Sequence, residues 1–326
     1  MRDLQHKQNS QKNIIFFKWL FFNICLLFAA NTFAQPTDDA PFIVVLGIAQ
    51  DAGFPQADCQ KACCAEAWKN PDIRQKTACL GIVDPVSGER WMIDATPNFK
   101  EQLWELNTHV SNRDTQPLNG VLLTHAHVGH YTGLMHLGFE IIGAKSVPVY
   151  AMPRMKSFLE SSGPWHQLVR LQNIDIQPVN DGVEVQLNER IRITPFLVPH
   201  RDEYSETVGY RISGPNQSAI FIPDIDKWEK WDRQIEELIT SSDRAYLDGS
   251  FYYNDEVQGR DMSEFPHPFI IESMQRFAEL QQTDRQKVTF IHFNHSNPVM
   301  QPQSEQAQAV RKKGFRLAKE GEIFKL

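Results

Sequence analysis

The chain has 326 residues, of which 41% are hydrophobic and 22% are charged, so it can bury a large core and lacks the composition of a disordered protein. Its formal net charge is −7, which argues against non-specific binding to nucleic acid or to anionic lipid. We find neither an internal repeat nor a low-complexity tract in it.

The N-terminal segment has the pattern of a secretory signal. Basic residues precede the apolar run 19–30, which is short for a membrane span and ends in small and polar residues. We therefore predict a signal peptide over 1–34 and export to the periplasm or beyond, without stable membrane insertion after cleavage. An uncleaved anchor is the alternative. Removing 1–34 takes away four basic residues and one acidic residue, so the mature chain carries −10.

The remainder of the chain, 35–326, reads as one domain of mixed strands and helices without a convincing linker. Apolar runs predict strands at 42–48, 79–83, 91–95, 121–123, 147–150, 191–200, 208–212, 219–224, 244–248, 288–292 and 322–324. Helical patterns are found at 97–106, at 155–159, at 227–238, at 269–280, at 304–313, and in a segment after His130 that carries Leu134, Leu137 and Ile141. This order predicts an α/β protein with two sheets packed face to face and helices outside.

A cluster of three histidines follows one of these strands. His125, His127 and His130 lie within six residues, and His130 is placed at the start of the next helix. In a tight turn from strand to helix, the first two imidazoles can converge on one cation, and the third can reach it from the other side. Three imidazoles grouped in this way are hard to explain by packing, so the cluster indicates a metal site.

Further metal-binding residue types recur at strand ends. His200, Asp224, Asp248 and His292 each close an apolar run. In proteins that mix strands and helices, such strand ends are where binding and catalytic groups gather. Each residue also has a simpler reading: His200 or Asp224 as a cap, His292 as a hydrogen-bonded core residue, and Asp248 as a solvent-facing carboxylate.

The segment His125-Ala126-His127-Val128-Gly129-His130 resembles the His-x-His-x-Asp-His signature of the metallo-β-lactamase superfamily. The resemblance implies that superfamily's four-layered αββα sandwich. It also implies that His125, His127 and His200 hold a first metal, that Asp224 bridges two metals, and that His130 and His292 hold a second. The motif's aspartate is replaced by Gly129 here, which leaves the second site one carboxylate short. Either the second metal is then weakly bound, or water or substrate takes the place of the missing ligand.

A second pair of residues resembles the phosphodiesterase branches of the superfamily. There, an acidic residue after a strand orients a histidine that opens a later helix, and Asp248 and His267 match that arrangement. The resemblance implies that His267 acts as the general acid and that Asp248 fixes its tautomer. The alternative is that His267 caps the helix after it.

The cysteines remaining in the mature chain include a crowded group, Cys59, Cys63 and Cys64. Cyclic-phosphate phosphodiesterases and pyrroloquinoline quinone biosynthesis B proteins carry a similar Cys-rich loop. In the phosphodiesterases, a structural zinc there is completed by a histidine three residues beyond an active-site histidine, which corresponds to His295. The resemblance therefore implies a closed zinc site, with disulfides or free thiols as alternatives.

Gly53-Phe54-Pro55-Gln56 and Asn294-His295-Ser296-Asn297-Pro298 also resemble the pyrroloquinoline quinone B-like branch. We expect an exported hydrolase that uses hydroxide on one or two zinc, manganese or iron ions to cleave a phosphodiester, small ester or lactone. An iron-dependent oxygenase-like enzyme and a non-catalytic metal-binding protein are the alternatives. The expected partner is a small-molecule substrate, while the substrate's identity and the oligomeric state stay open.

Overall fold

The computed structural model describes residues 39–111, 116–257, 259–262 and 265–326, so the predicted signal peptide lies outside the described residues. Its strands form two sheets of seven strands each. The first sheet has the order β14 (Ile323–Lys325), β1 (Phe42–Gly47), β2 (Cys79–Asp84), β3 (Glu89–Ile93), β4 (Gly120–Leu122), β5 (Val147–Ala151) and β6 (Ile174–Pro178). The second has the order β13 (Arg316–Leu317), β12 (Val288–Ile291), β11 (Arg244–Asp248), β10 (Ser218–Ile222), β9 (Val208–Ser213), β8 (Arg192–Leu197) and β7 (Val185–Gln186).

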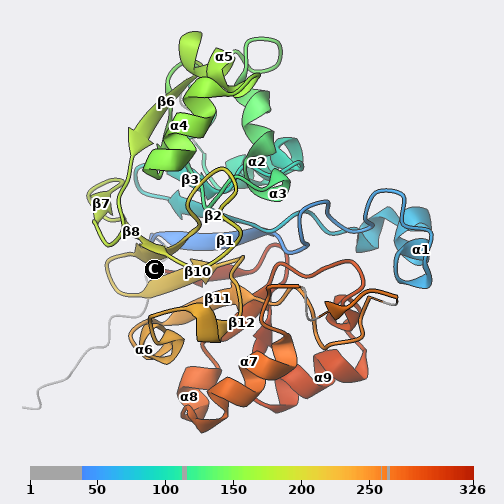
Figure 1. Ribbon diagram of the computed structural model, residues 1–326. Coiled ribbons are helices and arrows are strands. Elements are labelled where there is room, and N and C mark those ends of the chain that lie inside the picture. Colours follow the sequence, from blue (N-terminus) through green and yellow to red (C-terminus); the bar gives the residue numbers. More distant parts are fainter. Residues whose placement is uncertain (1–38, 112–115, 258, 263–264) are drawn as a thin grey trace, which may run out of the picture. The chain divides into compact units, whose positions relative to one another are not determined.

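Strands β1 to β4 of the first sheet each divide their apolar side chains between two hydrophobic clusters. In β1, Ile43 and Val45 join the cluster that also contains the apolar residues of the second sheet. The alternate residues Phe42, Val44 and Leu46 join the cluster formed with the helices. This period of two is what a strand buried on both faces produces. The two sheets therefore pack face to face, as expected from the sequence, with helices on the outer faces (Figure 1).

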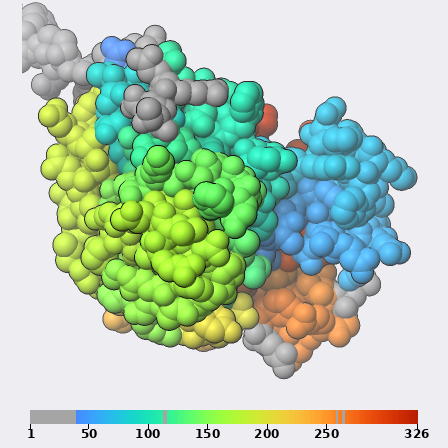
Figure 2. All heavy atoms as spheres, turned by 90° about the horizontal axis from the view of Figure 1, so that it is seen from above, coloured from blue at the N-terminus to red at the C-terminus, as the bar shows by residue number. Residues whose placement is uncertain are grey.

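The helices of the described residues are short. Figure 1 shows α2 (Phe99–Thr108), α3 (Val128–Tyr131), α4 (Pro153–Ser161) and α5 (Trp165–Arg170) on the side of the first sheet, and α6 (Ile235–Thr240), α7 (Ile270–Arg276), α8 (Gln282–Arg285) and α9 (Glu305–Lys312) on the side of the second. Helix α1 (Ala62–Lys69), drawn in blue, stands beside the sheets in Figure 1, and the blue part of the chain protrudes at one side of the space-filling view (Figure 2). Among the described helices, none has the length and apolar character that a membrane crossing requires.

Parallel pairing brings the ends of key strands to one edge. β10, β11 and β12 are mutually parallel neighbours, and so are β3 and β4. The carboxyl ends of parallel neighbours lie side by side, so the residues that follow them are brought together. This arrangement carries Asp224, Asp248 and His292 from the second sheet, and Asp94 and His125 from the first, to the site described below.

Two helix predictions were wrong. The segment after His130 is not one amphipathic helix: α3 has four residues, a 3₁₀ turn spans Thr132–Leu137, and Ile141 is exposed. Gly133 lies so near the backbone of Thr96 that a Cβ there would be 2.2 Å from its carbonyl oxygen. Only a residue without a side chain fits such a close approach, which is made by a tight turn. The apolar residues Leu134 and Leu137 therefore lie on a 3₁₀ turn, although their spacing is that of a regular helix.

The Trp-rich segment 227–238 is likewise broken, into a 3₁₀ turn at Trp228–Lys230 and α6. Both indoles are buried and have hydrogen-bond partners in other elements, because Trp228 Nε1 donates to Ser273 Oγ and Trp231 Nε1 donates to Leu197 O. A buried indole N–H needs such a partner. Trp231 therefore adopts an extended backbone (φ −92°, ψ 134°), which ends the turn.

Candidate metal centre

Four predicted ligands converge at the edge of the sheets. One nitrogen or oxygen from each of His125, His127, His200 and Asp224 lies within 4.8 Å of the others. The two carboxylate oxygens of Asp224 are each 3.3 Å from an imidazole, Oδ2 from His125 Nε2 and Oδ1 from His200 Nε2. His127 approaches through Nδ1, which is 2.9 Å from His125 Nε2. The structure thus brings together the set of residues expected to hold the first metal.

The outward nitrogens of these imidazoles have partners that fix their tautomers. The Thr124 hydroxyl donates to Asp94, so it accepts from His125 Nδ1 at 3.0 Å. Asp226 accepts from His200 Nδ1 at 3.2 Å. A carboxylate can only accept, so each ring, when neutral, presents an Nε2 lone pair to the centre.

His130 and His292 form a neighbouring group and are oriented in the same way. Asp94 accepts from His130 Nδ1 at 2.7 Å. Ser250 donates its hydroxyl to Asp248 and accepts from His292 Nδ1 at 2.9 Å. Both histidines are fully buried, and their Nε2 atoms face inward.

Sequence reasoning missed two carboxylates. Asp51 lies within 4.8 Å of the ligand atoms of His130 and His292, and Asp94 orients His130. Asp51 belongs to a loop after β1 that reads as irregular, and no periodicity marks it. Asp94 directly follows strand β3, so the strand-end pattern that singled out Asp224 and Asp248 could have found it too.

The donor atoms fit a divalent cation. Five of these side-chain atoms are buried without a hydrogen-bond partner: Nε2 of His130, His200 and His292, Oδ1 of Asp224, and Oδ1 of Asp51. Buried polar atoms in native proteins are almost always paired, so a group of unpaired lone pairs aimed at one space is the arrangement that a cation would satisfy. Imidazole and carboxylate donors suit zinc, manganese and ferrous iron.

The charges around the rings also favour a cation. Burial disfavours a charged imidazole, yet Asp94, Asp51 and Asp224 outweigh it and raise the pKa of His130 to about 9. Asp224 and Asp226 likewise outweigh burial and raise the pKa of His200 to about 10. Burial, followed by the charge of His130, lowers the pKa of His125, which keeps that ring neutral. The carboxylates thus create a negative potential that protons neutralise when no metal is bound.

His267 and Asp248 meet beside this centre. Asp248 is fully buried and accepts from His267 Nδ1 at 2.8 Å. Its position is held by the Ser250 N–H and hydroxyl and by the Ile225 N–H. His267 Nδ1 is also 3.2 Å from Asp224 Oδ1.

A cavity of about 420 Å³ opens over this pair, and its walls include His267, Asp51, Arg201 and Arg260. A cavity of this size accommodates a small molecule.

The cysteine cluster lies elsewhere, next to α1. Single atoms of Cys59, Cys63, Cys64 and His295 lie within 4.8 Å of one another, and His295 Nδ1 is buried without a partner. All the described cysteines are free, and the Cys59 and Cys63 sulfurs are 3.8 Å apart. The sequence analysis placed Cys63 and Cys64 in a loop, which was wrong, because both lie in the first turn of α1.

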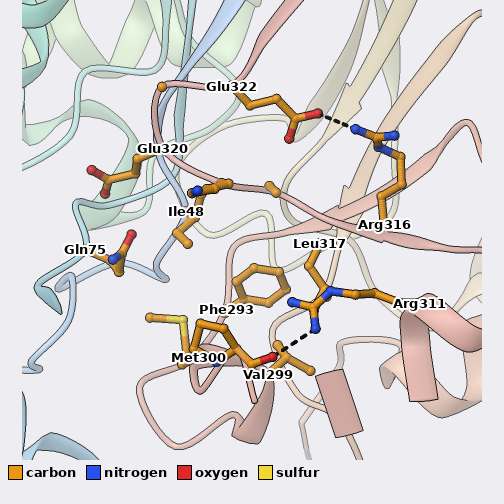
Figure 3. Close-up of a pocket in the computed structure, with 14 residues that line it drawn as sticks. Ile48, Gln75, Phe293, Val299, Met300, Arg311, Arg316, Leu317, Glu320 and Glu322 are labelled. Atoms are coloured by element: carbon orange, nitrogen blue, oxygen red, sulfur yellow. Dashed lines mark hydrogen bonds and ion pairs between the residues drawn. The ribbon is translucent and has the colours of Figure 1, made fainter. Parts of the chain in front are cut away.

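A larger cavity of about 710 Å³ is lined by Ile48, Phe293 and the segment after β13 (Figure 3). Its arginines are already paired: Arg316 with Glu322, and Arg311 with the Pro302 carbonyl. None of the clustered histidines or cysteines lines it. The histidine centre therefore lies outside this larger cavity.

Comparisons with known proteins agree with this fold. Residues 89–293 match the family described as "Beta-lactamase superfamily domain". The chain is similar to coenzyme PQQ synthesis protein B of Xanthomonas oryzae, at 24% identity over 301 residues that cover 86% of this chain and 98% of that protein. Among solved structures, it is similar to zinc-bound PqqB from Methylobacterium extorquens (TM-score 0.75, 21% identity, 87% of this chain and 100% of that one). It is also similar to a diphosphatase of the PhnP family (TM-score 0.61, 21% identity, 88% and 97%).

Metal affinity should rise with pH. The raised pKa values of His130 and His200 mean that both rings carry a proton at pH 7 in the metal-free protein, whereas a cation binds only neutral imidazole. Zinc binding should therefore release protons, and the apparent affinity should increase as the pH approaches about 9. Calorimetric titration in two buffers of different ionisation enthalpy measures both quantities. Affinity that is independent of pH, with no proton release, would contradict the assignment.

Proposed function

Because the chain belongs to the beta-lactamase superfamily, we propose that it is a metal-dependent hydrolase of a small phosphodiester or another small ester or lactone. The observation that carries this proposal is the His267–Asp248 pair beside the histidine centre. A metal site alone could serve binding or redox chemistry. Hydrolysis also requires a group beside the metal that donates a proton to the leaving oxygen, and His267 is placed to do this.

His125, His127, His200 and Asp224 would hold one cation, and His130 and His292 would take part in holding a second. When bound, such a cation polarises a substrate oxygen and lowers the pKa of water towards neutrality. The protein's contribution is to orient the donors. Thr124, Asp226 and Asp94 fix the ring orientations of His125, His200 and His130, so little reorganisation is needed when charge develops in the site.

His267 supplies the proton for the leaving oxygen. Its Nδ1–H donates to Asp248, which leaves Nε2 for the substrate in the adjoining cavity. Burial lowers the pKa of His267, but Asp248 and Asp224 outweigh it and raise that pKa above the ordinary value. The two carboxylates therefore favour the doubly protonated ring, which is the form that can give a proton to a leaving alkoxide.

The cavity walls favour an anionic substrate. Arg201 and Arg260 both line the space over His267 and carry positive charge in an otherwise acidic protein. Guanidinium groups bind phosphate oxygens in a bidentate geometry that a neutral lactone cannot use. The similar PhnP-family protein is a diphosphatase, which supports a substrate that carries phosphate.

A second candidate is an iron-dependent oxygenase-like reaction, favoured by the similarity to PQQ synthesis protein B. Three imidazoles and a carboxylate can also hold ferrous iron with open positions. Oxygen uptake by the iron-loaded protein, with no metal-dependent hydrolysis, would support this reading. If the metal-loaded protein shows neither oxygen uptake nor hydrolysis in these assays, the third alternative, a non-catalytic metal-binding protein, is supported.

We also propose that the protein is exported after removal of residues 1–34 and that Cys59, Cys63, Cys64 and His295 hold a structural zinc. The crowded sulfurs and the unpaired His295 nitrogen support the zinc reading over disulfides. A closed four-ligand site of this type stabilises the fold around it rather than taking part in chemistry.

Replacing the proposed general acid should slow catalysis without removing the metal. His267→Ala should lower kcat for a phosphodiester such as bis(p-nitrophenyl) phosphate by about 10²–10⁴-fold. Asp248→Asn should also lower kcat, because the ring stays in place but loses the carboxylate that fixes its tautomer and raises its pKa. His166→Ala, which changes an exposed histidine of helix α5, is the matched control. Wild-type turnover in His267→Ala, with the metal content unchanged, would disprove the role.

The cysteine site is tested by counting zinc and thiols. Cys63→Ser should lose one zinc per chain and lower the unfolding temperature, because three ligands hold zinc more weakly than four. Cys79→Ala changes a buried cysteine outside the cluster and should keep the full zinc content. If unfolding the protein without reductant releases no thiols and no zinc from this cluster, the cysteines form disulfides instead.

A further inference from the structure

The second group of ligands contains two buried imidazoles, but the motif's aspartate, which would add a negatively charged ligand, is replaced by Gly129. His130 and His292 point unpaired Nε2 atoms into the same space, and the helix that carries His130 has Gly129 at the preceding position. Two neutral imidazoles alone form a poor cation site, because they bring no charge to offset that of the ion.

We propose that Asp51, from the loop after β1, is the carboxylate ligand of a second cation at this position. Its Oδ1 is 3.7 Å from His130 Nε2, and it lies within 4.8 Å of the donor atom of His292 as well. Although the side chain as a whole is 35% exposed, Oδ1 itself is buried and has no hydrogen-bond partner. Three converging donors without partners, one of them anionic, form a facial site for a divalent ion.

Gly129 is what allows Asp51 to reach this place. A Cβ on Gly129 would lie 2.4 Å from Asp51 Oδ1 and 2.5 Å from Asp51 Cα. The loop that carries Asp51 can therefore take this path only because residue 129 has no side chain. The glycine that left the second site short of a carboxylate in the sequence is the residue that lets a carboxylate enter from another segment.

The loop is bonded to the segment that carries the other ligand. Gln50 N donates to Phe293 O at 2.8 Å, and Asn294 Nδ2 donates to Gln50 Oε1 at 2.6 Å. Thr77 Oγ1 donates to the Asp51 carbonyl from the other side. These bonds couple the position of Asp51 to that of His292.

Both ligands also sit in the left-handed region, with φ of 23° for Asp51 and 68° for His292. A histidine in that conformation is uncommon, and such backbone strain gathers at binding and catalytic sites.

Asp224 joins the two groups. Its Oδ2 is 3.3 Å from His125 Nε2 and 3.7 Å from His130 Nε2, so one carboxylate lies between both sets of imidazoles. With Asp51 the second set has two imidazoles, its own carboxylate and a share of Asp224. In this proposal the second site has a carboxylate of its own, supplied by Asp51 in place of the aspartate that the motif lacks at Gly129.

The inference rests on the metal-dependent site proposed above, and it is tested by counting ions. Manganese is titrated into the metal-depleted full-length protein and bound Mn²⁺ is followed by electron paramagnetic resonance. The wild type should take up two interacting ions at the histidine centre. Asp51→Asn, which keeps the shape but removes the charge, should retain the first ion and bind the second at least about 100-fold more weakly, with loss of the spin coupling. Asp72→Asn, an exposed aspartate, is the control.

Gly129→Ala provides a second test, since its methyl group should displace Asp51 and weaken the second ion in the same way. Two coupled ions of unchanged affinity in Asp51→Asn would overturn the assignment, and so would a wild type that takes up a single ion at this centre. If the ion counts come out as expected but the protein cleaves no ester, lactone or phosphodiester, the proposed function fails while the role of Asp51 stands.

Discussion

The structure depends on burying several carboxylates and imidazoles where water cannot reach them. Asp224 is 3% exposed and lies among His125, His200 and His130. Burying an ionised carboxylate costs several kcal/mol unless opposite charge is close by. Protons on His130 and His200 can supply that charge, and a divalent cation can supply it with the unpaired lone pairs as its ligands. The sandwich is the framework that makes this arrangement possible, because parallel strands from both sheets end at the same edge.

The sequence allowed the fold and the histidine centre to be predicted because strong local signals mark both. Apolar runs located the strands. His125 and His127 stand out by their close spacing after one such run, and Asp224 and His292 stand out because each closes a run of its own. Asp51 could not be found in this way, since its place depends on a left-handed loop and on the missing side chain at Gly129, two features with no periodic signature. The broken helices after His130 and at 227–238 were mispredicted because close backbone contact at Gly133 and the hydrogen bonds of buried indoles overrode helical spacing.

Related chains with this sandwich include proteins named for cofactor synthesis and for phosphate chemistry, so the fold alone does not choose the reaction. What distinguishes one use from another is the set of groups next to the metal. Here these groups are His267, which is hydrogen-bonded to Asp248, and two guanidinium groups on the wall of the cavity. That combination suits cleavage of an anionic ester, in which a leaving oxygen must gain a proton and the substrate brings negative charge.

The measurement that tests the central claim most directly is an anomalous diffraction experiment on crystals of the zinc-loaded protein at the metal's absorption edge. We predict a peak bounded by His125, His127, His200 and Asp224, with nitrogen and oxygen ligands at about 2.0–2.2 Å. A map without density at that place, or one in which these three imidazoles turn away from a common centre, would contradict the account.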